Sequence, residues 1–166
     1  MYSSITSFIF AVCPSEAIPL SGNGKLSSPN YPISNYPASR NCSWVITVPS
    51  DKQVKFVFTE LALGLCENVC SSGNCTYVEL YDGASTGSPL IGRFCNGSVL
   101  QDVWSSGNQM FVQFRSGSSL DRGFEAEYFV SSGRTTTTLP MTAPTSTPSQ
   151  GGKETGELML LTLFML

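Results

Sequence analysis

The stretch from Ser28 to Trp44 reads SPNYPISNYPASRNCSW, and it narrows the fold more than any other part of the chain. Its three prolines exclude a helix, because each lacks a backbone N–H and biases the residue before it towards an extended conformation. Tyr31 and Tyr36 supply large apolar surface, and Cys42 offers a covalent link. The stretch therefore predicts an extended, aromatic-anchored loop that leads into a disulfide-tied strand, as in extracellular β-domains.

The composition limits what this chain can do chemically. Nine Lys and Arg stand against twelve Asp and Glu in 166 residues, a net charge of −3, and no basic cluster suggests nucleic acid as a partner. Histidine is absent, which excludes Ser-His-Asp, Cys-His and His-based zinc-protease chemistry within this sequence. Glu125 and Glu127 are expected on the solvated face of one strand rather than in a catalytic cleft. We therefore predict that the protein is not an enzyme.

The cysteines and the glycosylation sequons indicate an oxidising compartment. An even number of cysteines favours disulfides, and a zinc site without histidine would need four thiolates, for which no Cys-x₂-Cys pair is present. The six cysteines are Cys13, Cys42, Cys66, Cys70, Cys75 and Cys95. Three Asn-x-Ser/Thr sequons, at Asn41, Asn74 and Asn96, predict N-glycosylation. Together these features predict an extracellular protein, either secreted or anchored at the cell surface.

Between residues 13 and 130 the chain alternates apolar and polar residues in short runs. A period of two residues, with turn residues between the runs, predicts strands and leaves no sustained helical period. The expected strands cover 42–48, 54–59, 76–81, 89–94, 99–105, 110–115 and 124–130. Ser106-Gly-Asn108 is read as a tight hairpin between two of them. Seven or more such strands predict an all-β, two-layer antiparallel β-sandwich.

The two ends differ from this central part. Residues 1–12 are expected to be a partial or short signal peptide, because Ile5 to Val12 are largely apolar, although this run is short and no Lys or Arg precedes it. The alternative is a first strand of the domain. Residues 131–157 are rich in Thr, Ser and Pro and predict an extended stalk. Residues 158–166 read LMLLTLFML, too short to cross a bilayer as a helix. They suggest membrane attachment through a GPI signal, with a truncated membrane segment and a soluble product as alternatives.

Several motifs, taken in order, resemble those of the CUB domain, an extracellular β-sandwich interaction module with a jelly-roll topology. The resemblance covers residues 13–130 and rests on matches at 28–32, 36–37, 42–44, 77–83, 90–95, 105–108, 110–114 and 123–128. Each motif is weak alone, but together and in register they are specific.

The resemblance implies a disulfide framework. It pairs Cys13 with Cys42, and it pairs a cysteine before the central strand with Cys95. Cys75 is nearest to that position and Cys70 is the alternative, which leaves Cys66 for whichever of the two remains. We favour Cys75–Cys95 together with Cys66–Cys70.

The resemblance also implies the position of a calcium site, whose ligand residues are replaced in this sequence. Many members of the family bind calcium through one Glu and two Asp, because calcium needs six to eight oxygens and carboxylates supply the charge. The matching positions here are Gly64, Thr76 and Gly117, so all three anionic ligands are missing. Only a rearranged loop would bring in the substitutes, which are Glu60, Glu67 and Asp121. We therefore expect no cofactor and no calcium.

Several aromatic and basic side chains could have either a structural role or a role in binding. Tyr31 and Tyr36 are expected to pack against the sandwich rather than contact a ligand. Arg93, Arg115 and Arg122 meet either an acidic ligand or neighbouring carboxylates such as Glu79 and Glu125, with little net effect in the second case. Trp44 is expected in the core.

The resemblance implies a non-enzymatic extracellular recognition module that binds a protein or glycan partner and is displayed on the Thr/Pro stalk. One alternative is a structural component of a secreted matrix or coat. The other is an accessory domain of a larger extracellular protease. A fold alone does not name a partner.

Overall fold

The computed structural model describes residues 13–65, 70 and 74–133, and these ranges form nine strands. The strands are β1 (Ile18–Ser21), β2 (Gly24–Ser27), β3 (Asn41–Thr47), β4 (Gln53–Ala62), β5 (Tyr77–Tyr81), β6 (Leu90–Phe94), β7 (Val103–Trp104), β8 (Gln109–Arg115) and β9 (Gly123–Ser131). Within these ranges the structure contains no helix that is long and apolar enough to span a membrane. The predicted all-β class is confirmed.

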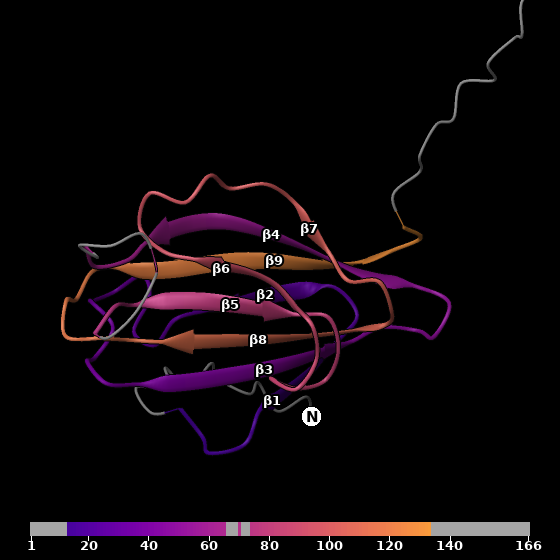
Figure 1. Ribbon diagram of the computed structural model, residues 1–166, viewed down its shortest axis with the longest axis horizontal. Helices are drawn as coiled ribbons and strands as arrows, with labels where there is room; N and C mark the ends of the chain where they lie inside the picture. The colour runs from indigo at the N-terminus through magenta and orange to yellow at the C-terminus, as the bar shows by residue number, and fades with distance from the viewer. Residues whose placement is uncertain (1–12, 66–69, 71–73, 134–166) are drawn as a thin grey trace, which may run out of the picture. The chain divides into compact units, whose positions relative to one another are not determined.

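The strands form two layers (Figure 1). One sheet has the order β1-β3-β8-β5-β6 and the other has the order β2-β9-β4-β7. The predicted two-layer antiparallel sandwich is confirmed, and among the described strands one pair, β1 with β3, is parallel. The chain crosses to the second sheet as β2 before it returns as β3, and β1 and β3 therefore run in the same direction. Pro19 is tolerated in β1 because this strand lies at the sheet edge.

The core lies between the inner faces of the two sheets. In β9, Phe124 and Ala126 are fully buried while Glu125 between them is half-buried, as the period of two predicted. Phe114 of β8 meets Phe124 across the layers with their ring centroids 5.5 Å apart. Trp44 also packs edge-on against Phe124, so its predicted place in the core is confirmed.

The turn at residues 106–108 differs from the prediction. Ser105 is tied to Val54 of β4 by two hydrogen bonds, one through its N–H and one through its hydroxyl. The residues before the turn therefore belong to the four-stranded sheet, and β8 after it belongs to the five-stranded sheet. The turn carries the chain between layers and is not a hairpin.

The disulfides in the structure decide between the cysteine pairings that were expected from the sequence. Cys13 is bonded to Cys42, as the resemblance implied, with the Cα atoms 4.9 Å apart. Cys70 is bonded to Cys95 with the Cα atoms 5.7 Å apart, so the favoured Cys75–Cys95 pair was wrong. Cys75 is disulfide-bonded elsewhere, and Cys66 lies outside the described residues. Cys70 bonds to Cys95 because of the path of the loop. The carbonyl of Cys70 accepts a hydrogen bond at 3.0 Å from Arg93 Nη1 on β6, and Cys95 directly follows this strand.

Candidate functional site

The three positions of the expected calcium ligands lie together at one end of the sandwich. Gly64 follows β4, Thr76 precedes β5 and Gly117 follows β8. These strand ends meet at the left of Figure 1. The predicted positions are therefore brought together, although they are far apart in the sequence.

A network of uncharged groups connects these positions. The Thr76 hydroxyl donates to the Ser119 carbonyl at 3.3 Å and accepts a hydrogen bond from the Gly117 N–H at 2.9 Å. The Tyr36 hydroxyl donates to the same carbonyl at 3.0 Å and accepts from the Gly64 N–H at 2.7 Å. Thr76 and Tyr36 are both fully buried. We call these five residues the loop network.

The residues at this place do not fit a calcium ion. A Cβ atom on Gly64 would overlap the carbonyl of Ser119, and one on Gly117 would overlap that of Asn74, so no acidic side chain has room there. Of the substitutes, Glu60 pairs with Arg122, and the Asp121 carboxylate accepts a hydrogen bond from the Arg122 N–H at 2.7 Å. Glu67 lies outside the described residues. Across the part of the chain that the structure describes, no three His, Cys, Asp or Glu side chains gather as a metal site.

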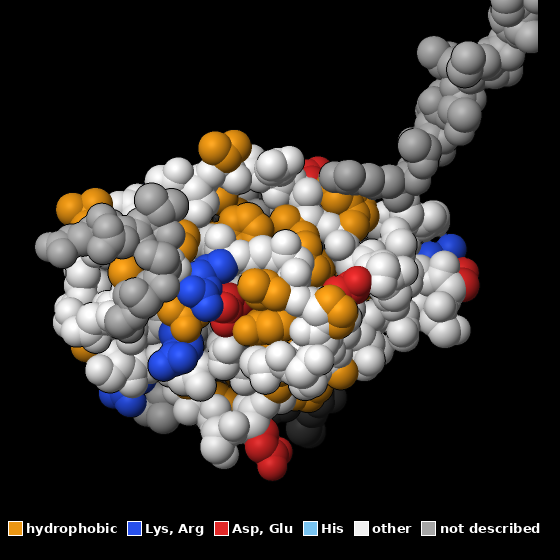
Figure 2. Space-filling model, viewed as in Figure 1, with side chains coloured by type: hydrophobic (Ala, Val, Ile, Leu, Met, Phe, Trp, Pro, Cys, Tyr) orange, Lys and Arg blue, Asp and Glu red, His pale blue; other side chains and the backbone are white. Residues whose placement is uncertain are grey.

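Beside the loop network lies a pocket of about 480 Å³, which we call the arginine pocket. Its lining residues are almost all polar, and they are Ser39, Arg40, Asn41, Asn74, Cys75, Tyr77, Arg93, Arg115, Ser116 and Gly117. Asn41, Arg115 and Tyr77 are cross-strand neighbours on β3, β8 and β5. They project from the outer face of the five-stranded sheet, because the next residues along these strands are buried. Figure 2 shows blue basic side chains gathered on this face.

Arg93 is held by a buried acidic partner. Its Nε donates to Glu79 Oε1 at 2.8 Å, its Nη2 lies 2.6 Å from the same oxygen, and Glu79 is only 4% exposed. The hydrogen bond to Glu79 raises the pKa of Arg93. Tyr81 also donates to Glu79 at 2.8 Å, and burial, followed by this hydrogen bond, raises the pKa of Tyr81 to about 12. The charge of Arg93 is therefore balanced within the fold.

Arg40 and Arg115 differ from Arg93. Both are exposed, and among the described residues neither forms a salt bridge. None of the described residues that line the arginine pocket is an Asp or Glu. The guanidinium carbon of Arg115 lies 5.9 Å from the centre of the Tyr77 ring, and that of Arg93 lies 4.4 Å from it. The pocket therefore carries two uncompensated positive charges next to a fixed aromatic ring.

Two of the three predicted glycosylation asparagines line this pocket. Asn41 and Asn74 are exposed there, and Asn96 is exposed outside it. The Asn41 side-chain oxygen accepts a hydrogen bond from Gln113 at 3.0 Å, and the Asn74 amide donates to Ser118 at 3.0 Å. Whether sugars are attached stays a prediction.

The structure also shows where the remaining candidate residues lie. Tyr36 packs in the core, as expected, and Tyr31 is half-buried. Arg122 pairs with Glu60 rather than with Glu125. Arg40 was missed, because the only signal near it in the sequence was the sequon that follows.

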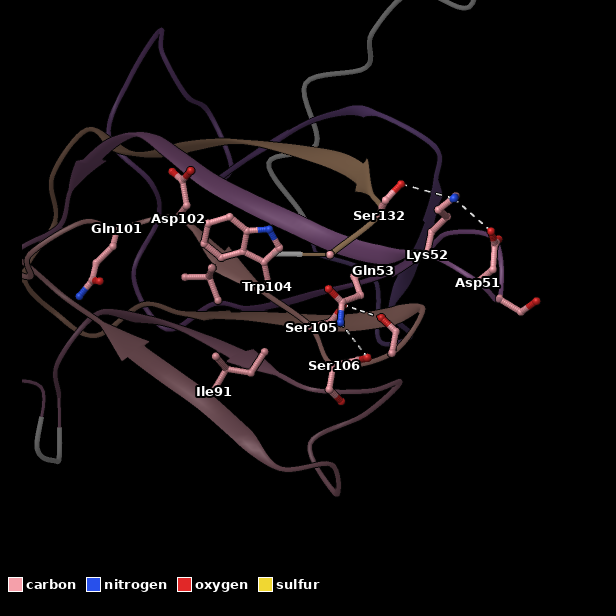
Figure 3. A pocket seen from close by; sticks show the side chains of 14 residues that line it. Asp51, Lys52, Gln53, Ile91, Gln101, Asp102, Trp104, Ser105, Ser106 and Ser132 are labelled. Carbon is pink, nitrogen blue, oxygen red and sulfur yellow. Dashed lines mark hydrogen bonds and ion pairs between the residues drawn. The ribbon is translucent and has the colours of Figure 1, made fainter. Parts of the chain in front are cut away.

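A second, larger pocket of about 820 Å³ lies beside β4 and β7 (Figure 3). Its charged side chains are already paired. Lys55 lies 2.7 Å from Asp102 and sits over the Trp104 ring at 5.5 Å, and Lys52 lies 3.0 Å from Asp51. These pairs leave this pocket without a net charge for a ligand, so the arginine pocket is the stronger candidate.

The fold and the disulfides among the described residues define a disulfide-linked β-sandwich, and residues 13–128 match the family model of the CUB domain. The chain belongs to the CUB domain family. A bone morphogenetic protein 1 homolog from Strongylocentrotus purpuratus is 39% identical over 108 residues, which cover 64% of this chain and 16% of that protein. Human cubilin is 34% identical over 110 residues, 64% of this chain and 3% of that protein. The chain thus matches only a small part of each relative.

Solved structures agree with this membership. The CUB1-EGF-CUB2 domains of rat MASP-1 match with a TM-score of 0.57 and 26% identity, over 69% of this chain and 42% of that chain. The MASP-1 CUB2 domain bound to Ca²⁺ matches with a TM-score of 0.55 over 68% of this chain and 96% of that chain; its 22% identity shows the fold alone. CUB domains are non-catalytic interaction modules of extracellular and cell-surface proteins.

Proposed function

We propose that this protein is a non-enzymatic recognition module outside the cell, which binds a protein or glycan partner through the end of the sandwich that carries the arginine pocket. The observation that carries the proposal is the pair of uncompensated arginines in a polar pocket on a rigid sheet. Binding residues are commonly placed at loop ends held by a rigid scaffold. The absence of histidine from the sequence supports a role in binding rather than turnover.

The loop network supports the same proposal. It connects three loops through buried hydrogen bonds, so the residues beside it, such as Ser116 and Asn74, are presented in a fixed arrangement. A preorganised surface loses less conformational entropy when it binds.

We also propose that residues 131–157 form a stalk and that residues 158–166 belong to a GPI signal, which is removed when the lipid anchor is joined to the chain. Residues 134–166 lie outside the described residues, so this proposal rests on composition. Release of the protein from intact cells by a phosphatidylinositol-specific phospholipase is the expected result. Retention on the cells after that treatment would contradict the anchor.

Binding to cells tests the recognition function. The protein, made in eukaryotic cells, collected from the medium or after phospholipase release, and labelled, is titrated onto a panel of cell lines and onto extracellular matrix. Saturable binding is expected, and the reduced and alkylated protein is the control because it lacks the disulfide-dependent fold. Binding that never saturates, or that survives reduction, would contradict a folded recognition site.

A second candidate is an accessory domain of a larger extracellular protease. It is favoured by the similarity to mouse tolloid-like protein 1, which is 32% identical over 111 residues, 65% of this chain and 10% of that protein. A longer transcript that joins this domain to a catalytic domain would support it.

A further inference from the structure

We infer that the arginine pocket binds a single acidic sugar unit through its carboxylate or sulfate group. This inference rests on the proposed function and names its ligand class. Three of the nine basic residues of the chain line one pocket of about 480 Å³. Pockets of a few hundred Å³ are of the size that holds a small ligand.

The charge of the pocket indicates an anion. Glu79 balances Arg93, but no carboxylate among the described residues balances Arg40 or Arg115. A guanidinium group presents a planar fork of N–H donors that matches a carboxylate or sulfate in a bidentate way. Two such groups suffice for one anionic group and are too few for a long polyanion, which needs an extended basic surface.

The position of each arginine is supported by the fold. The backbone N–H of Arg40 donates to the Ser116 hydroxyl at 2.8 Å, and the Ser116 N–H donates to the Arg40 carbonyl at 2.9 Å. Arg115 is in register with Asn41 on one side and with Tyr77 on the other. The two arginines are thus anchored on adjoining backbone, and only their side chains need to settle around a ligand.

The rest of the lining favours a sugar over a peptide. Apart from the three arginines, the Tyr77 ring and Cys75, the described lining residues present amides, hydroxyls and backbone, and none of them is Ala, Val, Leu, Ile or Met. The central contacts of protein interfaces combine Arg with several apolar and aromatic anchors, and here Tyr77 is the one aromatic ring among the described lining residues. A sugar acid supplies both the anionic group and the ring hydroxyls that Asn41, Asn74 and Ser39 can hydrogen-bond.

The test uses the full chain made in bacteria and oxidatively refolded, so that Asn41 and Asn74 carry no sugar and keep the side chains that the inference needs. The probes are sialyllactose for a carboxylate, a sulfated heparin disaccharide for a sulfate, and lactose as the neutral sugar. Binding is followed by ligand-observed NMR titration.

We expect saturable binding of at least one acidic sugar, none of lactose, and weaker binding as the salt concentration rises. Arg40→Ala and Arg115→Ala should each weaken binding about tenfold or more, because each removes charge-assisted hydrogen bonds. Arg115→Lys should retain part of the affinity, since it keeps the charge but loses the fork. Lys25→Ala, which removes one charge from the other sheet, should leave binding unchanged.

Failure of all acidic probes, equal binding of lactose, or indifference to both arginine substitutions would overturn the inference. Equal or tighter binding of a polyglutamate peptide would replace the sugar with an acidic protein segment and also overturn it. Thermal unfolding midpoints show whether each variant is folded. If saturable cell binding persists while every acidic sugar fails, the proposed function stands and only this inference is lost.

Discussion

At the scale of single residues, Thr76 shows how a short uncharged side chain connects loops of this sandwich. Its hydroxyl both donates and accepts, and it is fully buried. Removing one partner of a buried hydrogen bond costs about 1–3 kcal/mol. Thr76→Val is therefore expected to lower the free energy of unfolding by about that amount, measured by chemical denaturation.

The control for this change is Thr59→Val, whose hydroxyl is exposed on β4. Both variants are compared in the Asn74→Gln background, because Thr76 is also part of the Asn74 sequon. Equal stability of the two variants would show that the loop network does not hold this end together.

A substitution at Gly117 tests whether this end of the sandwich can bind calcium. Gly117→Asp restores an acidic residue at a family ligand position, but its Cβ would overlap the Asn74 carbonyl. We expect a lower melting temperature and no calcium binding by calorimetry, for the variant and for the original chain alike. Calcium binding by the original chain, lost in Glu60→Ala, would contradict this expectation.

The Tyr81 phenol should ionise at a higher pH than an exposed tyrosine does. Burial and the hydrogen bond to Glu79 raise its pKa to about 12 from an ordinary value of 10.0. The folded state therefore holds this proton more tightly than the unfolded state. The resulting stability is complete below about pH 10 and is lost as the pH rises towards about 12.

Phenolate absorbance during an alkaline titration measures this difference. The late step should be smaller by one tyrosine in Tyr81→Phe but should not vanish, because Tyr128, whose pKa burial also raises, should still ionise late. A late step of unchanged size in Tyr81→Phe would contradict the prediction.

At the scale of elements, β1 is the strand most dependent on a covalent link. It has four residues at the edge of its sheet and pairs only with β3, to which the Cys13–Cys42 bond ties the preceding segment. This bond closes a loop with a sequence separation of 29, worth about 3.5 kcal/mol on the chain-entropy model. Replacing both cysteines with Ser should lower the free energy of unfolding by roughly that amount.

Amide hydrogen exchange locates this effect. Protection should fall first in β1, while β8 in the middle of the same sheet stays protected. A uniform loss of protection across both strands would mean that the link supports the whole sheet rather than its edge.

At the scale of the whole molecule, one mass measurement tests both the number of disulfides and the attachment of sugars. Three disulfides should add about 6 Da on reduction. Peptide mapping is expected to join Cys70 to Cys95, as the structure has them, and Cys66 to Cys75. A glycosidase should lower the mass if the sequons carry sugars. Intact mass spectrometry of protein from eukaryotic cells measures all of these, and a free thiol would contradict the framework.

Much of the sandwich could be predicted from local pattern. Alternation in the 42–48 and 124–130 runs assigns Trp44 and Phe124 to the core, because a strand turns successive side chains to opposite faces. The same logic failed at 106–108, where the turn residues are right but the strands on either side belong to different sheets. Turn chemistry is local, whereas the choice of sheet depends on which strand is free to pair.

By itself, the sequence determined the fold class, the family resemblance and the loss of the acidic residues at Gly64, Thr76 and Gly117. Only the tertiary structure decided that Cys70 meets Cys95, that β1 runs parallel to β3, and that Arg40 and Arg115 share a pocket. The reason is physical. Burial patterns repeat over two residues and can be read from one segment, but these contacts join segments 25 to 75 residues apart, and the packing of the two sheets sets their register.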